Sequence, residues 1–230
     1  MTDTANAHAG ADRHAPARER MLASIRLMAD EAAAYGGVPI SERVLDVMAA
    51  VPRHRFVPDA EEYAAYQNQP LPIGHGQTIS QPYIVALMTE LLALEARHKV
   101  LEVGTGSGYQ AAILSRLAGQ VYSVEIVVPL AEAAAQRLHE QGYDKVEVKA
   151  GDGSLGWPEH APYDAIIVTA AAEQVPPALL QQLKPGGRMV IPVGGWLDVQ
   201  QLMLITKAYD GTLQHKRIEP VRFVPLTGAG

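Results

Sequence analysis

The sequence predicts an α/β fold built on a doubly wound, mostly parallel sheet. From residue 83 onward, apolar segments of strand length alternate with amphipathic segments of helical length. One apolar segment, residues 99–103, runs directly into three glycines at alternate positions, Gly104, Gly106 and Gly108. Another, residues 164–169, contains an unbroken apolar run typical of a strand in the middle of a parallel sheet. Together these observations predict a Rossmann-like architecture preceded by a helical addition.

The chain before residue 83 is predicted to be helix and loop. Residues 1–18 contain few aromatic or branched side chains and are expected to be disordered. Helices are expected at residues 19–35, before two glycines, and at residues 42–50. Residues 53–82 hold four prolines and a Gly-His-Gly turn. So long an irregular tract inside a compact domain indicates a functional loop.

From residue 83 the expected elements alternate regularly. Helices are expected at residues 83–95, 107–118, 129–141 and 176–183, the last followed by a Lys-Pro-Gly-Gly turn at 184–187. Strands are expected at residues 99–103, 120–125, 145–149, 164–169, 188–193, 200–206 and 216–224. Asp210 and Gly211 predict a hairpin turn before the last strand, so an antiparallel pair closes the C-terminal edge of the sheet.

Composition narrows the class of protein. The 230 residues suffice for one sizeable domain. The net charge of −6, with no basic stripe, argues against nucleic-acid binding. The absence of cysteine excludes disulfides, thiolate catalysis and cysteine-bound zinc, and the eight histidines show no metal-ligand spacing. There is no apolar run of membrane-spanning length and no secretory signal in residues 1–20, so a cytoplasmic enzyme without membrane contact is expected.

The glycine loop predicts a nucleotide-type cofactor site at the end of a parallel strand. A dinucleotide fingerprint would place its third glycine at the position of Tyr109. Glu102, directly before the loop, would repel a pyrophosphate but suits the cationic S-adenosylmethionine. Glu125 ends the next strand, where it can accept hydrogen bonds from ribose hydroxyls, and Asp152 follows the strand after that, near an adenine amino group. Three acids after three successive strands therefore predict S-adenosylmethionine as the cofactor.

Motifs spread over residues 41–228 point to one enzyme family. They are VPRHRFVP at 51–58, PLPIGHGQTISQP at 70–82, and the segments 102–109, 151–153, 163–170, 183–187 and 221–226. On the specific segments GQTISQP and VRFVP, the chain resembles the protein-L-isoaspartate (D-aspartate) O-methyltransferases, which are class I S-adenosylmethionine-dependent enzymes. Three departures stand out: residues 1–20 have no counterpart, residues 28–37 lengthen one segment, and Ile126 replaces a basic residue.

The resemblance implies methyl transfer from S-adenosylmethionine to the free α-carboxylate of L-isoaspartyl residues in damaged proteins and peptides. S-adenosylhomocysteine would be the product, and the methyl ester would close to a succinimide, which initiates repair. A carboxylate with a reference pKa of about 3.5 is ionised at neutral pH, so no general base is needed. Catalysis would then consist mostly of positioning the reactants and excluding water. The chain is expected to act as a monomer and as a single domain, with residues 19–82 on the substrate side of the cofactor-binding core at 83–230.

The resemblance also assigns site residues. The cofactor-binding set is Gln77, Thr78, Ile79, Glu102, Gly104, Thr105, Gly106, Ser107, Gly108, Glu125, Asp152 and Gly153. Gln77 either contacts the cofactor or orients the loop. Ser80 is expected to hold the substrate carboxylate as the catalytic residue; by position alone it serves equally well as the N-cap of the helix at 83. Arg222 and Val224 are expected to shape the substrate groove, and a core contact is the alternative for Val224.

Three other functions stay open at this point. A methyltransferase for a small molecule or RNA would use the same fold, because fold does not fix the acceptor. A non-catalytic cofactor-binding module would also keep the glycine loop. A nicotinamide oxidoreductase is disfavoured by Glu102 and Tyr109, and comparing the binding of S-adenosylhomocysteine and NAD would separate it from a methyltransferase.

Overall fold

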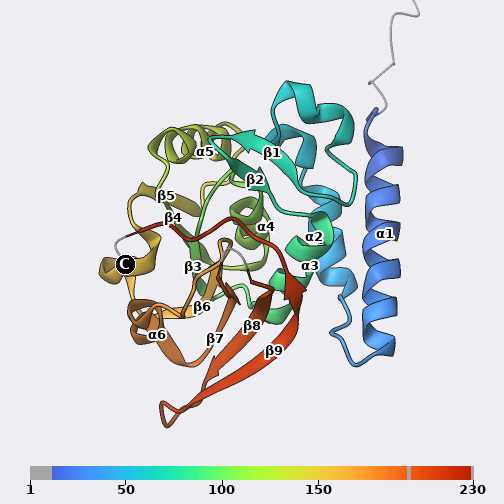
Figure 1. Ribbon diagram of the computed structural model, residues 1–230. Coiled ribbons are helices and arrows are strands. Elements are labelled where there is room, and N and C mark those ends of the chain that lie inside the picture. Colours follow the sequence, from blue (N-terminus) through green and yellow to red (C-terminus); the bar gives the residue numbers. More distant parts are fainter. Residues whose placement is uncertain (1–11, 196–197, 229–230) are drawn as a thin grey trace, which may run out of the picture.

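A seven-stranded sheet forms the centre of the protein in the computed structural model, which describes residues 12–195 and 198–228 (Figure 1). Its spatial order is β5-β4-β3-β6-β7-β8-β9. The strands are β3 (Lys99–Val103), β4 (Gln120–Glu125), β5 (Val146–Ala150), β6 (Tyr163–Val168), β7 (Leu183–Val193), β8 (Gln200–Lys207) and β9 (Leu213–Val221). The first five in this order are parallel, and β8 pairs antiparallel with both of its neighbours. The predicted doubly wound sheet with an antiparallel C-terminal edge is confirmed.

The chain reverses its direction across the sheet between β3 and β6. From β3 it proceeds through β4 to β5 at one edge, and then returns to place β6 on the other side of β3. At such a switch point the loops after the two neighbouring strands separate and leave a crevice at their carboxyl ends. The glycine loop follows β3, so the sequence delivers it to this crevice.

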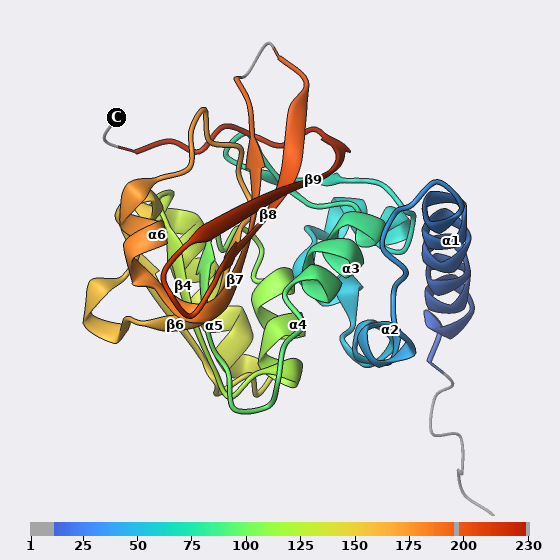
Figure 2. The same ribbon diagram turned by 90° about the horizontal axis from the view of Figure 1, so that it is seen from below.

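Helices cover both faces of the sheet. They are α1 (Ala15–Ala34), α2 (Glu42–Ala50), α3 (Pro82–Leu91), α4 (Tyr109–Leu117), α5 (Val128–Glu140) and α6 (Pro177–Gln182). Helix α1 is the outermost element, with α2 and α3 between it and the rest of the protein (Figures 1 and 2). The N-terminal helices therefore add a layer to one face of the sheet, as the sequence predicts.

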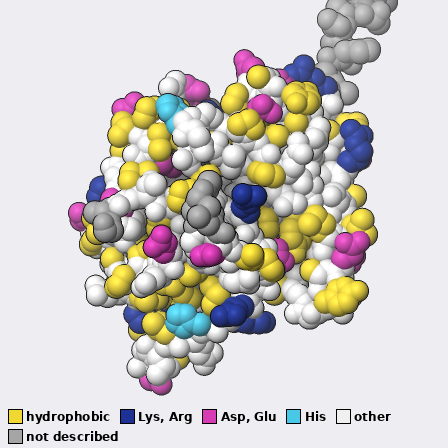
Figure 3. Space-filling view, in the orientation of Figure 1, with side chains coloured by type: hydrophobic (Ala, Val, Ile, Leu, Met, Phe, Trp, Pro, Cys, Tyr) yellow, Lys and Arg dark blue, Asp and Glu magenta, His cyan; other side chains and the backbone are white. Residues whose placement is uncertain are grey.

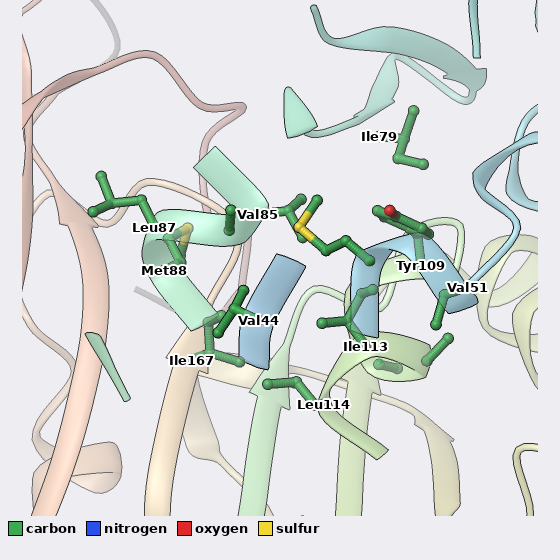
Figure 4. Close-up of a cluster of buried hydrophobic side chains, with 14 of the residues drawn as sticks. Val44, Val51, Ile79, Val85, Leu87, Met88, Tyr109, Ile113, Leu114 and Ile167 are labelled. Carbon is green, nitrogen blue, oxygen red and sulfur yellow. The ribbon is translucent and has the colours of Figure 1, made fainter. Parts of the chain in front are cut away.

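Alternate residues of the central strands enter two separate cores. Ile167 of β6 packs with side chains of α2, α3 and α4, among them Val44, Met88 and Ile113 (Figure 4). Ile166, one position earlier, belongs to the core on the opposite face of the sheet. Because the strand is buried on both sides, its sequence is apolar throughout instead of alternating.

The N-terminal segment departs from the prediction in two ways. Helix α1 begins at Ala15, so the disorder expected up to residue 18 is wrong for residues 15–18, while residues 1–11 lie outside the described ranges. The tract expected to be irregular contains the 3-10 turns η1 (Arg53–Phe56) and η2 (Asp59–Ala64) and a hairpin of β1 (Leu71–Gly74) with β2 (Gln77–Ile79). The hairpin was not predicted because prolines obscure its short strands.

The later elements differ from the prediction mainly at their ends. Helix α3 stops at Leu91, four residues early, and α4 starts at Tyr109. The Lys-Pro-Gly-Gly segment is a bulge inside β7, since the pairing with β6 passes from Tyr163↔Leu183 to Ala165↔Arg188. Strand β9 ends at Val221, so residues 222–224 leave the sheet. In the described parts of the chain, every helix is too short or too polar to cross a membrane.

Candidate active site

A cleft lies over the carboxyl ends of β3, β4 and β6, at the switch point of the sheet. About 750 Å³ of empty space lies within it, part of which is open to solvent. It is lined by the end of the β1–β2 hairpin, the start of α3, the glycine loop, the loops after β4, β5 and β6, and the C-terminal segment. The lining residues include Gln77, Thr78, Ile79, Ser80, Gly104, Thr105, Gly106, Ser107, Tyr109, Gln110, Glu125, Ile126, Gly153, Thr169, Ala170, Val224 and Thr227.

The glycine loop takes a conformation that side chains would obstruct. Gly104, Gly106 and Gly108 all have positive φ angles, of 95°, 51° and 87°. A Cβ atom on Gly104 would lie 2.4 Å from the hydroxyl oxygen of Thr169. That hydroxyl donates a hydrogen bond to the carbonyl of Gly104, at 2.6 Å. The absence of a side chain thus allows β6 to support the loop from below and keeps the backbone open toward the cleft.

Glu125 closes the cleft beside the loop. Its Oε2 accepts a hydrogen bond from the N–H of Gly106 at 2.8 Å, and its Oε1 accepts one from the N–H of Val127 at 2.9 Å. The carboxylate is therefore fixed by two backbone donors, and each oxygen keeps a second lone pair for a further donor. Its position in the cleft lining fits the predicted contact with ribose hydroxyls, which stays a prediction.

The carboxyl group of Glu102 lies beneath the loop and is fully buried. Its Oε2 contacts the hydroxyl of Ser123, which lies 2.5 Å from the hydroxyl of Thr105. Burial raises the pKa of Glu102 to about 8, so the group is mainly protonated at pH 7. Glu102 does not line the cleft. The expectation that Glu102 offers a negative charge to a cationic cofactor is thus corrected, and a direct cofactor contact stays a prediction.

Asp152 has a local structural role that the sequence did not reveal. Its Oδ1 accepts hydrogen bonds from the N–H and the hydroxyl of Ser154, at 2.9 and 2.7 Å, and so caps the short η3 turn (Gly153–Leu155). Gly153 lines the cleft, whereas Asp152 lies just outside its lining. A Cβ atom on Gly228 would lie 2.2 Å from Oδ1, so the C-terminal segment passes directly beside this carboxylate. The predicted contact with adenine stays untested.

The segment of residues 77–80 forms the opposite wall of the cleft. Thr78 is exposed, Ile79 is buried, and Ser80 is partly exposed where β2 ends. The N-cap of α3 is Gln81, so Ser80 does not hold the capping position proposed as its alternative role. Ser80 is one of the residues that line the cleft.

The C-terminal segment crosses the carboxyl ends of the central strands (Figure 1). Its backbone pairs with the loop after β6, because the N–H of Ala171 donates to the carbonyl of Val224 at 2.8 Å. The buried amide of Gln200 donates to the carbonyl of Phe223 at 3.1 Å and accepts from its N–H at 2.6 Å. Val224 is partly exposed and lines the cleft, so it is not simply a core residue. Arg222 is exposed and lies outside the cleft lining.

Several cleft residues were not singled out from the sequence. Thr169, Gln110 and Tyr109 line the cleft through contacts that join segments far apart in the chain. For Thr169 a signal existed, since a polar residue ends an otherwise apolar central strand at the switch point. The sequence carries no such signal for Gln110. Its amide donates a hydrogen bond to the buried hydroxyl of Thr89 at 2.9 Å, and Thr89 lies on another helix.

The cleft holds few groups that could exchange a proton. Among the described lining residues, Glu125 and Tyr109 are the ionisable ones, and burial raises the pKa of Tyr109. Nor do the described residues contain a group of three histidines or acids that could hold a metal ion. The arrangement is thus suited to binding and orienting reactants, and Glu125, whose two oxygens each accept a backbone hydrogen bond, supplies the carboxyl group among the described lining residues.

Comparison with known proteins is consistent with this geometry. A family model described as protein-L-isoaspartate(D-aspartate) O-methyltransferase matches residues 26–230. A Polaromonas sp. (strain JS666) protein named protein-L-isoaspartate O-methyltransferase 2 is 61% identical over 209 residues, covering 90% of this chain and 99% of that protein. A Cupriavidus necator protein named protein-L-isoaspartate O-methyltransferase 1 is 58% identical over 218 residues, covering 94% of this chain and 84% of that protein.

Two solved structures share the fold. One, named protein-L-isoaspartate O-methyltransferase, is 30% identical with a TM-score of 0.79; the similarity covers 92% of this chain and 66% of that chain. The other is from Plasmodium falciparum and is described as a candidate protein of the same name in complex with S-adenosyl-L-homocysteine. It is 22% identical with a TM-score of 0.73, and the similarity covers 94% of this chain and 99% of that chain.

Proposed function

The chain belongs to the protein-L-isoaspartate(D-aspartate) O-methyltransferase family, and we propose from this premise how its cleft works. The enzyme transfers a methyl group from S-adenosylmethionine to the free α-carboxylate of L-isoaspartyl residues in damaged proteins and peptides. The methyl ester is a better leaving group than the carboxylate, so the succinimide re-forms and repair begins. The match to the family over residues 26–230, which includes every segment of the cleft, carries this assignment.

The residues of the cleft fit the cofactor. The three glycines leave the backbone of the loop open, and Glu125 offers acceptors to a ribose. Glu102 Oε1 is a buried polar atom without a hydrogen-bond partner in the described structure, directly below the loop. When bound, S-adenosylmethionine supplies an electrophilic methyl group on a sulfonium centre, and S-adenosylhomocysteine is the product. The residues that would hold it are the glycine loop, Thr78, Ile79, Glu125 and Gly153.

The acceptor needs orientation and no activation. Its carboxylate has a reference pKa of about 3.5 and is ionised at neutral pH. The near absence of ionisable groups from the cleft supports this scheme, because a hydroxyl acceptor would require a base. We assign Ser80 to hold the carboxylate through its hydroxyl, with Val224 and Arg222 shaping the groove for the peptide backbone.

The remaining contribution of the chain is to hold the reactants in line and to exclude water. Apolar side chains line the cleft from β2 (Ile79), α3 (Val85), β3 (Val103), β4 (Val124) and the C-terminal segment (Leu226). Well-oriented reactants in such a site react as if present at very high concentration, about 10⁵ M or more. Positioning between these apolar walls is therefore the main contribution to the rate that we propose for the chain.

Transfer of labelled methyl to a matched pair of peptides tests the function. One peptide carries L-isoaspartate and its partner carries L-aspartate at the same position. Base-labile methyl ester on the isoaspartyl peptide alone is the expected result. Label on neither peptide, with binding of S-adenosylhomocysteine intact, would contradict the assignment and favour a small-molecule acceptor instead.

The cellular setting is part of the proposal. We propose a cytoplasmic monomer that does not act on nucleic acid. In support, lysine and arginine side chains form separate groups on the face shown in Figure 3, with acidic and apolar side chains between them. The chain also contains no cysteine, which fits a compartment where disulfides are rare. Size-exclusion chromatography with light scattering and cell fractionation test these points.

A further inference from the structure

Arg53, the first residue of the η1 turn, is a completely buried arginine. Its Nε donates to the carbonyl of Ala65 at 2.8 Å, and its Nη2 donates to the carbonyl of Ser80 at 2.8 Å. No ion pair to Arg53 occurs among the described residues. A guanidinium is thus buried on backbone carbonyls alone, and one of them belongs to the residue assigned to the substrate carboxylate.

The same guanidinium also contacts Tyr109, a residue on the cofactor side of the cleft. It lies 4.9 Å from the ring centroid of Tyr109, within the range of a cation–π contact. Tyr109 is the first residue of α4, directly after the glycine loop, and lines the cleft. Arg53 therefore contacts the substrate segment at Ser80 and the end of the cofactor loop at Tyr109, and its bond to Ala65 fixes it to the N-terminal addition.

The stability of the fold alone does not explain why a charged arginine is buried at position 53. Burying a cation is costly because its hydration is lost, and apolar side chains of similar volume in place of buried charges are often at least as stable. Burial lowers the pKa of Arg53 to about 10, so the cost is not avoided by losing the proton at pH 7. Its Nη1 has no hydrogen-bond partner in the described structure. What the guanidinium provides is a rigid planar fork that fixes two carbonyls relative to each other.

We infer that Arg53 is a positioning residue for methyl transfer, which sets the backbone of Ser80 relative to the glycine loop. This inference rests on the proposed function, because it assigns Arg53 to the reaction through Ser80. Arg53 does not line the cleft and touches neither reactant directly. Its effect on the rate follows from geometry, since a displacement of about 1 Å in a reacting group lowers rates by about 100-fold.

Two variants of Arg53 and one matched control test this role. Arg53→Met removes the charge and all donors but keeps much of the length, whereas Arg53→Lys keeps a charge but has a single donor nitrogen in place of three. The control is Arg43→Met. Arg43 also donates to two backbone carbonyls, those of Leu94 at 2.6 Å and Leu117 at 3.5 Å, but both lie outside the cleft lining.

The expected result is a selective loss of the acceptor reaction. In Arg53→Met, kcat/KM for the isoaspartyl peptide falls by at least about tenfold. Arg53→Lys retains more of the wild-type kcat/KM than Arg53→Met does. In both Arg53 variants the Kd for S-adenosylhomocysteine changes less than threefold. Arg43→Met lowers the thermal midpoint without lowering kcat/KM. An unchanged kcat/KM in Arg53→Met, or an equal loss in Arg43→Met, would overturn the inference.

A second measurement does not depend on activity. Hydrogen–deuterium exchange of peptides covering residues 77–82 should be faster in Arg53→Lys than in the wild type, with exchange in β4 unchanged. If residues 77–82 exchange at the same rate in Arg53→Lys and in the wild type, the positioning role is contradicted. This holds even if the wild type methylates no isoaspartyl peptide. Conversely, wild-type inactivity with altered exchange would refute the proposed function and leave the structural role of Arg53 in place.

Discussion

The buried carboxyl of Glu102 should make the protein less stable as the pH rises, and replacing it with glutamine should remove that dependence. Glutamine has nearly the same shape, stays neutral and can still bond to Ser123. In the folded protein the pKa is raised from 4.5 to about 8. The folded state therefore holds this proton more tightly than the unfolded chain, which loses it above pH 4.5. Hence the free energy of unfolding falls as the pH rises from 4.5 toward 8.

The size of the effect follows from the two pKa values. Each pKa unit corresponds to about 1.4 kcal/mol, so the full shift corresponds to about 5 kcal/mol. Between pH 5 and pH 8 the carboxyl of Glu102 is largely ionised in the unfolded chain. In the folded protein it stays mainly protonated over this interval and is half ionised at pH 8. Glu102 thus accounts for a loss of about 3 to 4 kcal/mol over this interval. A loss of that size is a large fraction of the stability of a typical domain, about 5–15 kcal/mol.

Urea unfolding followed by circular dichroism at pH 5, 6, 7 and 8 measures this difference. The stability of Glu102→Gln relative to the wild type should increase by about 3 kcal/mol from pH 5 to pH 8. Other titrating groups cancel because they are common to both proteins. Glu147→Gln serves as the control, since its carboxylate on β5 bonds to the amide of Gln120 at an exposed site. Parallel stability curves for Glu102→Gln and wild type would refute the burial argument.

Three further predictions concern the cleft. Ser80→Ala should lower kcat at least about tenfold, because the substrate carboxylate loses its orienting hydroxyl. The Kd for S-adenosylhomocysteine, measured by calorimetry, should stay within threefold of the wild-type value. Lost cofactor binding would instead indicate that Ser80 has a scaffold role. Gly104→Ala places a Cβ 2.4 Å from the Thr169 hydroxyl at a φ of 95°. It should weaken S-adenosylhomocysteine binding by at least about tenfold at a strain cost of 1–3 kcal/mol, and normal affinity would show that the loop adapts. Gln200→Leu leaves the N–H and carbonyl of Phe223 without their partner, so it should lower the free energy of unfolding by about 2 kcal/mol and raise the peptide KM. An unchanged KM would argue against a substrate role for the C-terminal segment.

Local patterns were sufficient to predict the order of the helices and strands from residue 83 onward. The apolar runs of β3 and β6, the glycines after β3 and the acid after β4 are each recorded in a few consecutive residues. The parallel sheet follows from the alternation of such segments, and the position of Glu125 in the cleft follows from the sheet. The segment Thr78–Ser80 was located through a resemblance of motifs, and the fold brings it to the opposite wall of the same cleft.

Elements whose form depends on distant partners were predicted less well. The β1–β2 hairpin is held against the rest of the cleft, and its proline-rich sequence resembles an irregular loop. The Lys-Pro-Gly-Gly segment has the composition of a turn, yet pairing with β6 on both sides makes it a bulge within β7. In each case hydrogen bonds to another strand outweigh the local preference.

The fold class, the cofactor loop and the family can be read from the sequence, because they depend on the residue types and spacings of short segments. Three features require the folded structure: the burial of Glu102, which keeps it mainly neutral at pH 7, the support of Gly104 by the Thr169 hydroxyl, and the bond from Arg53 to the carbonyl of Ser80. Burial and hydrogen-bond partners are set by residues distant in the chain. The protonation of Glu102 and the placement of Ser80 therefore emerge only once the chain has folded.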